Sequence, residues 1–125
     1  MVRFLLICLG GALGTGVRYL TALAAARWVG AEFPYGTLAV NLVGAFAIGL
    51  VQAVGAAAMI PDTLRLALAI GVMGGLTTYS AFSYETIVLA EVGAWSRVWL
   101  NIMLTNAGTL TLCALGIAAG RALAR

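Results

Sequence analysis

Hydroxyl-bearing and acidic side chains gather in one short segment of this chain, between residues 74 and 85. The segment reads Gly-Gly-Leu-Thr-Thr-Tyr-Ser-Ala-Phe-Ser-Tyr-Glu, and its polar members within nine positions are Thr77, Thr78, Tyr79, Ser80, Ser83 and Glu85. Hydroxyl groups can both donate and accept hydrogen bonds, so they can replace the hydration of a small solute. The segment is therefore where we expect a small ion or polar solute to be handled.

The rest of the chain predicts a membrane around this segment. Of its 125 residues, 63% are hydrophobic and 9% are charged, whereas charged residues make up about 25% of an ordinary soluble domain. Four nearly uncharged stretches each reach the roughly 20 residues that span a bilayer core of about 30 Å. We expect an all-α membrane protein with a single domain over residues 1–125. Its transmembrane helices are predicted at about residues 3–28, 35–58, 63–92 and 96–122.

The glycine-rich segment predicts a break near residues 74–78 of the third helix. Within a bilayer, irregular backbone persists only where it is buried in protein or lines a cavity. Polar residues on two other helices could line the same cavity. Asn41 is an isolated amide on the second helix, and Asn101, Thr105 and Thr109 follow one another at i, i+4 and i+8 on the fourth. Interhelical hydrogen bonds of roughly 0.6–2 kcal/mol are the structural alternative, but three helices carrying so many polar groups favour a solvated track.

The track suits an anion better than a cation. The chain has no histidine, and Glu85 is the only carboxylate near the polar residues. Asparagine amides and hydroxyls can donate to an anion, and the positive edges of aromatic rings add a weak attraction. Tyr79 and Phe82 are three residues apart, so they share one helix face. This chemistry predicts a path for a small, hard anion.

The seven arginines are spread singly, which argues against a nucleic-acid surface. Their positions also bear on the orientation of the chain in the membrane. Arg3, Arg65, Arg121 and Arg125 are expected toward one membrane face, and Arg18, Arg27 and Arg97 toward the other. Because positive charge near the membrane sets orientation, four against three gives almost no bias. Such a chain could insert in both orientations, and opposite copies could pair.

Three blocks of sequence resemble the Fluc fluoride channels, also called the CrcB family. They are the glycine motif with Arg18-Tyr19 in residues 10–19, the Gly-Thr-Leu-x-Val-Asn motif with its later glycines in residues 36–49, and the highly specific block 74–85. The resemblance covers nearly the whole chain. It implies a dual-topology homodimer of antiparallel four-helix subunits, with the third helix broken near the bilayer midplane. The dimer would lie in the plasma membrane, which is the inner membrane in cells that have two membranes. The resemblance also implies passive export of fluoride through two pores.

The resemblance further implies roles for particular residues. Backbone carbonyls of Gly74 and Thr77 from two subunits would hold a structural sodium ion at the dimer centre. The fluoride pathway would include Asn41, Tyr79, Ser80 and Phe82, and Arg18 would lie in a vestibule. The supporting polar residues are expected to be Thr78, Ser83, Glu85, Asn101, Thr105 and Thr109. Two positions depart from the family pattern, since Tyr79 replaces a commoner phenylalanine and Ala81 a usual threonine.

Other protein classes fit the sequence less well. Small multidrug-resistance exporters share the size, helix count and dual topology, but they need a glutamate in the first helix, and residues 4–26 contain no acid. A non-transporting structural subunit would explain the glycines but not the polar stripes on three helices. An enzyme is not expected, because no nucleophile and base, and no histidine or cysteine metal set, can be recognised.

Overall fold

A computed structural model describes all 125 residues, and the chain is helical throughout with no strand. Its elements in order are α1 (Val2–Trp28), α2 (Tyr35–Ala56), α3 (Asp62–Leu66), the π-helix η1 (Ala67–Met73), α4 (Gly74–Leu76), α5 (Tyr79–Glu91) and α6 (Trp95–Leu123). The elements from α3 to α5 follow one another as a single long segment. Four segments are long and apolar enough to cross a membrane, namely Val2–Trp28, Tyr35–Ala56, Asp62–Glu91 and Trp95–Leu123. The expectation of an all-helical protein with four apolar spans is confirmed.

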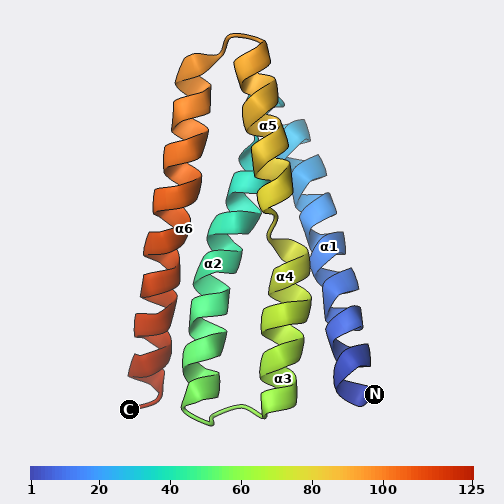
Figure 1. Cartoon of the computed structure of the whole chain (residues 1–125), viewed down its shortest axis with the longest axis vertical. Helices are drawn as coiled ribbons and strands as arrows, with labels where there is room; N and C mark the ends of the chain where they lie inside the picture. Colours follow the sequence, from blue (N-terminus) through green and yellow to red (C-terminus); the bar gives the residue numbers. More distant parts are fainter.

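The four segments form an open layer rather than a closed bundle (Figure 1). Helices α1 and α6 stand at opposite edges, with α2 and the α3–α5 segment between them, and both chain termini lie at the lower end. Contacts are most extensive between α2 and α6 and between α1 and η1, whereas α1 touches neither α5 nor α6. Because of this open arrangement only 20 of the 125 residues are buried, which leaves wide apolar faces for lipid or a second chain.

Glycines allow the closest approaches between neighbouring helices. A Cβ atom on Gly116 of α6 would collide with the carbonyl oxygen of Phe46 on α2, and one on Gly75 of α4 would collide with the carbonyl oxygen of Gly11 on α1. Small residues are common where transmembrane helices pack through their backbones. The first contact holds α6 against α2, and the second holds α4 against α1 and thereby places the residues that follow α4.

The helical run between Asp62 and Glu91 changes character twice. Residues Ala67–Met73 form a π-helix, whose wider turns carry i→i+5 hydrogen bonds and occur frequently at functional sites; nothing in the sequence analysis anticipated it. Helix α4 then ends at Leu76, and both Thr77 (φ −83°, ψ 151°) and Thr78 (φ −153°, ψ 117°) are extended before α5 begins at Tyr79. Figure 1 shows this two-residue interruption partway along the segment.

Candidate functional site

The interruption at Thr77–Thr78 is held by one side chain from α2. Asn41 Oδ1 accepts a hydrogen bond from the Thr78 backbone N–H at 2.7 Å, and Asn41 Nδ2 donates to the Thr78 carbonyl oxygen at 3.0 Å. Both residues are buried, with 6% and 8% of their surface exposed. The amide thus replaces the two backbone partners that Thr78 would have in a continuous helix. We call this pair of bonds the amide clasp.

The clasp leaves two carbonyl groups without their usual helical donors. In an uninterrupted α-helix the Thr78 N–H would reach the Gly74 carbonyl, but here it donates to Asn41 instead. The Thr77 carbonyl likewise accepts no hydrogen bond, since the Ala81 N–H donates to Thr78 Oγ1 at 3.2 Å. Carbonyl oxygens freed in this way are suitable ligands for a hard cation.

The hydroxyl groups beside the interruption mainly satisfy local backbone. Thr78 caps α5 through its bond from Ala81, and its Oγ1 also lies 3.1 Å from Ser80 Oγ. Thr77 Oγ1 donates to the Met73 carbonyl at 2.9 Å, and Ser83 Oγ donates to the Tyr79 carbonyl at 2.8 Å. A Cβ atom on Gly44 of α2 would collide with the Thr77 methyl group, so glycine there lets the interruption lie directly against α2.

A pocket of about 290 Å³ opens beside the interruption, and we call it the break pocket. It brings together seven of the residues predicted from the sequence, from α2, the α4–α5 interruption and α6: Asn41, Gly74, Thr77, Thr78, Tyr79, Thr105 and Thr109. Asn106, which the sequence analysis did not assign to the site, also lines it. No lining residue carries a charge. The predicted residues outside this pocket are Arg18, Ser80, Phe82, Ser83, Glu85 and Asn101.

The two aromatic residues predicted for the pathway do meet, but they differ in exposure. The ring centroids of Tyr79 and Phe82 are 5.1 Å apart with their planes at 53°, a geometry that favours aromatic pairs. Phe82 is 5% exposed, whereas Tyr79 is 68% exposed. The pair therefore runs from the packed interior of the chain to its open face.

The polar stripe predicted on α6 divides into two parts. Asn101, at 1% exposure the most buried side chain, donates through Nδ2 to Thr86 Oγ1 on α5 at 2.9 Å. Thr86 in turn donates to the Phe82 carbonyl at 2.6 Å. Thr105 Oγ1 donates to Asn101 Oδ1 at 3.4 Å. This part joins α5 to α6, and only the lower part of the stripe reaches the break pocket.

Two further predicted residues lie away from the break pocket. Glu85 accepts a hydrogen bond from Thr37 Oγ1 at 2.7 Å, while its second carboxylate oxygen is buried without a partner. Both residues line a pocket of about 170 Å³ beneath the α1–α2 connection. Arg18 is half-buried on α1 and forms no ion pair within the chain.

Sequence reasoning missed Thr37 and Thr86 as parts of these clusters. Thr37 and Thr86 are each buried and bonded to a residue that the sequence analysis did name, Thr37 to Glu85 and Thr86 to Asn101. A usable signal existed for Thr86, which is one helical turn after Phe82 and so shares its helix face. No local pattern could have paired Thr37 with Glu85, since 48 residues separate them.

Comparison with known proteins places these residues in a family. The sequence profile of the family described as CrcB-like protein, Camphor Resistance (CrcB), matches residues 5–117. Proteins named fluoride-specific ion channel FluC are similar over most of their length. One from Anaeromyxobacter sp. (strain K) is 50% identical over 111 residues, covering 88% of each chain. One from Geobacter sp. (strain M21) is 47% identical over 124 residues, covering 98% of this chain and all of the relative. A third, from Chelativorans sp. (strain BNC1), is 45% identical over 94% of each chain.

Proposed function

This chain belongs to the CrcB family, and we propose that it is a multi-pass channel of the plasma membrane that lets fluoride leave the cell passively. The relatives named above are described as fluoride-specific ion channels. The observation that carries the proposal is the break pocket, which is open, places two amides and several hydroxyls among apolar groups, and has no charged side chain. A pocket of this kind can solvate an anion without holding it so tightly that it cannot leave.

Two amides supply the donors that an anion would meet there. Asn41 and Asn106 each use one Nδ2 hydrogen, on the carbonyls of Thr78 and Ile102, and each amide has a second hydrogen. The hydroxyls of Thr77, Thr105 and Thr109 already donate to acceptors in their own helices. The two amides and the edge of the Tyr79–Phe82 pair therefore offer positive character, which suits a small hard anion.

Efflux from liposomes that contain only the purified protein tests this function. We expect the protein to discharge a fluoride gradient, and to pass chloride poorly. Potassium with an ionophore would set the membrane potential, and empty liposomes would serve as the control. Fluoride movement that needed a proton gradient would indicate an exporter rather than a channel, and chloride flux equal to fluoride flux would also contradict the proposal.

We further propose that two copies pair in antiparallel orientation. Its support is the open layer with its exposed apolar faces, together with the small difference in arginine count between the two ends. The interruption would then lie near the bilayer midplane, where it can face its symmetry mate. Labelling of a terminal cysteine from both sides of intact cells should find both orientations. A single orientation throughout would exclude this arrangement.

The free carbonyls at Gly74 and Thr77 fit a structural sodium ion at the centre of such a pair. Gly74 is exposed and nothing lies within 4 Å of the place where a Cβ atom would stand, so a second copy could approach it. No group of three or more histidine, cysteine or acidic side chains converges in the chain; the ligands would be backbone oxygens. Replacing sodium by a much larger cation should lower flux at constant driving force, and flux indifferent to the cation would rule the site out.

A further inference from the structure

A further pocket lies nearer the lower end of the molecule than the break pocket, and the two share no lining residue. It has a volume of about 460 Å³, and we call it the lower groove; its lining residues are Gln52, Ala53, Ala56, Ala57, Ile117, Arg121 and Ala124. On α2, Gln52 follows Ile48 of the break pocket by one turn, and on α6, Ile117 follows Thr109 by two. Residues at this spacing share a helix face. The two pockets thus open on the same side of the α2–α6 pair.

The first polar residue of the lower groove is Gln52, whose amide orientation is fixed by α3. Arg65 Nη1 donates to Gln52 Oε1 at 2.9 Å, while Arg65 Nε donates to Asp62 Oδ1 at 3.0 Å. The stem of Arg65 packs so closely on Gly55 of α2 that a Cβ atom there would collide with it. Because its oxygen is occupied by the guanidinium, Gln52 presents its NH₂ group as the free donor.

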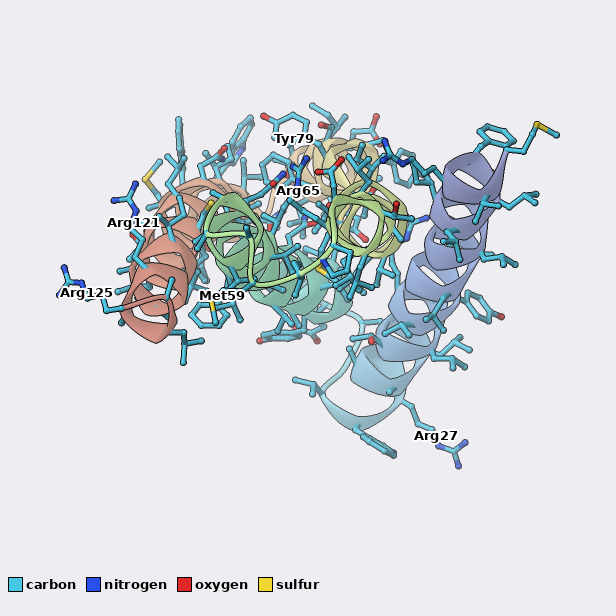
Figure 2. The ribbon with its side chains drawn as sticks, turned by 90° about the horizontal axis from the view of Figure 1, so that it is seen from below. Arg27, Met59, Arg65, Tyr79, Arg121 and Arg125 are labelled. Atoms are coloured by element: carbon cyan, nitrogen blue, oxygen red, sulfur yellow. The ribbon has the colours of Figure 1, made fainter.

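The second polar residue is Arg121, which has no acidic partner. Arg3 and Arg65 both lie near Asp62, and Arg97 at the upper end pairs with Glu32, but Arg121 forms no ion pair. Figure 2 shows Arg121 and Arg125 extending from the lower end of α6, away from the other helices. A free, exposed guanidinium acts on an approaching anion through its field rather than as a fixed ligand.

The charges at the two ends of the molecule also favour an anion at the lower end. The lower end carries four arginines (Arg3, Arg65, Arg121 and Arg125) and one acid, Asp62, a net of three positive charges. Toward the upper end, Arg18, Arg27 and Arg97 are balanced by Glu32, Glu85 and Glu91, so this end has no net charge. Clefts with one sign of charge raise the local concentration of the opposite ion.

From these observations we propose that the lower groove is an anion entrance, in which Arg121 attracts small anions and the Gln52 amide leads them toward the break pocket. The inference rests on the proposed channel function and adds two residues to it. The alanines of the groove keep it wide without adding polar groups that would hold the ion. Attraction without a deep binding site increases entry and leaves exit into the break pocket easy.

A pair of substitutions on α6 separates this role from a general effect of charge. Arg121→Gln and Arg125→Gln remove the same charge from the same helix end, but only Arg121 lines the groove. Fluoride efflux would be measured from neutral-lipid liposomes at ionic strengths of about 0.01 M and about 1 M, where the Debye lengths are about 30 Å and about 3 Å. Wild-type efflux in the same experiment tests the channel function itself.

We expect Arg121→Gln to lower efflux roughly three- to tenfold at low ionic strength and less than about twofold at high ionic strength. Arg125→Gln should stay within about twofold of wild type in both, and Arg121→Lys should retain most of the efflux. Equal losses in the two glutamine variants, or a loss at Arg121 that does not change with salt, would overturn the entrance. Absence of fluoride efflux in the wild type would overturn the channel function as well.

Gln52 needs a test that does not change charge. Gln52→Met keeps the length of the side chain and removes both the donor and the acceptor of Arg65. Because the lost group is neutral, efflux should fall by a similar factor at both ionic strengths. If Gln52→Met passed fluoride as fast as the wild type, the part of the proposal that assigns Gln52 to the entrance would be overturned.

Discussion

Two buried asparagines do different things in two regions of this molecule. Asn41 of α2 bonds the N–H and the carbonyl of Thr78, where the helical backbone is interrupted. Asn101 of α6 bonds the hydroxyl of Thr86, on an intact part of α5. The same side chain replaces missing backbone partners in the first region and joins two regular helices in the second.

This difference predicts how much stability is lost when each amide is removed. If Asn41 is removed, two backbone groups of Thr78 lose their partners in a setting with little water, which costs about 1–3 kcal/mol for each buried group. If Asn101 is removed, Thr86 still donates to the Phe82 carbonyl of its own helix. The loss is then one interhelical hydrogen bond, which averages about 0.6 kcal/mol between membrane helices, and the long bond from Thr105 within α6.

The largest effect is therefore expected at Asn41. Asn41→Leu should lower the thermal stability of the purified protein markedly and reduce fluoride efflux more than about tenfold, since both bonds of the amide clasp are lost. Asn41→Asp keeps an acceptor for the Thr78 N–H but loses the donor and adds a negative charge that repels an anion at close range. Efflux per folded protein and melting temperature are the two measurements.

Asn106→Leu is the matched control for stability. Asn106 lines the same pocket, but its amide bonds the Ile102 carbonyl one turn back on its own helix. Its loss should leave the melting temperature close to that of the wild type. If Asn41→Leu melted no lower than Asn106→Leu, the clasp would not be what holds the interruption.

Phe82 should show the next largest effect. If its ring edge contributes to the anion path, Phe82→Ile should stop efflux in protein that still purifies with its normal oligomeric state, because an aliphatic side chain has no positive edge. If Phe82 only fills space, Phe82→Leu should lose efflux only in proportion to folded protein. Near-normal efflux in both Phe82→Ile and Asn41→Asp would show that these residues are packing and that the pathway lies elsewhere.

The sequence predicted the four apolar spans and singled out most of the polar residues, because hydropathy and helical spacing are local properties. It could not say which partner each polar group takes. Asn101 looked like part of a solvated stripe, yet it is buried against Thr86, since the rotation of α6 against α5 decides which face is covered. The π-helix of residues 67–73 was also missed, because its sequence, Ala-Leu-Ala-Ile-Gly-Val-Met, is equally suited to an α-helix.

Substitution of Asn101 should cost less stability and less efflux than substitution of Asn41. Asn101→Leu should lower the free energy of unfolding by about 0.6–1.7 kcal/mol, the range of interhelical hydrogen bonds in membranes. Efflux should stay within about threefold of wild type, since Thr86 keeps its bond to Phe82 and the break pocket is not lined by Asn101. Thr86→Val removes the other end of the same bond, and the double variant should cost less than the sum of the two. Additive losses would mean that the two residues act separately.

The smallest effect is expected for Tyr79→Phe. The Tyr79 hydroxyl makes no hydrogen bond within the chain, and the ring is 68% exposed. Removing the hydroxyl leaves intact the contact between the rings of residue 79 and Phe82, whose centroids lie 5.1 Å apart. If the ring edge and not the hydroxyl meets the anion, efflux should remain within about twofold of wild type, whereas Tyr79→Leu, which removes the ring, should lower it clearly. Efflux measured at several fluoride concentrations in both variants would distinguish a role of the ring edge from a role of the hydroxyl. A large loss in Tyr79→Phe, with Tyr79→Leu no worse, would instead assign the contact with the anion to the hydroxyl, and the open face of α5 would then act through a hydrogen-bond donor like the amides of α2 and α6.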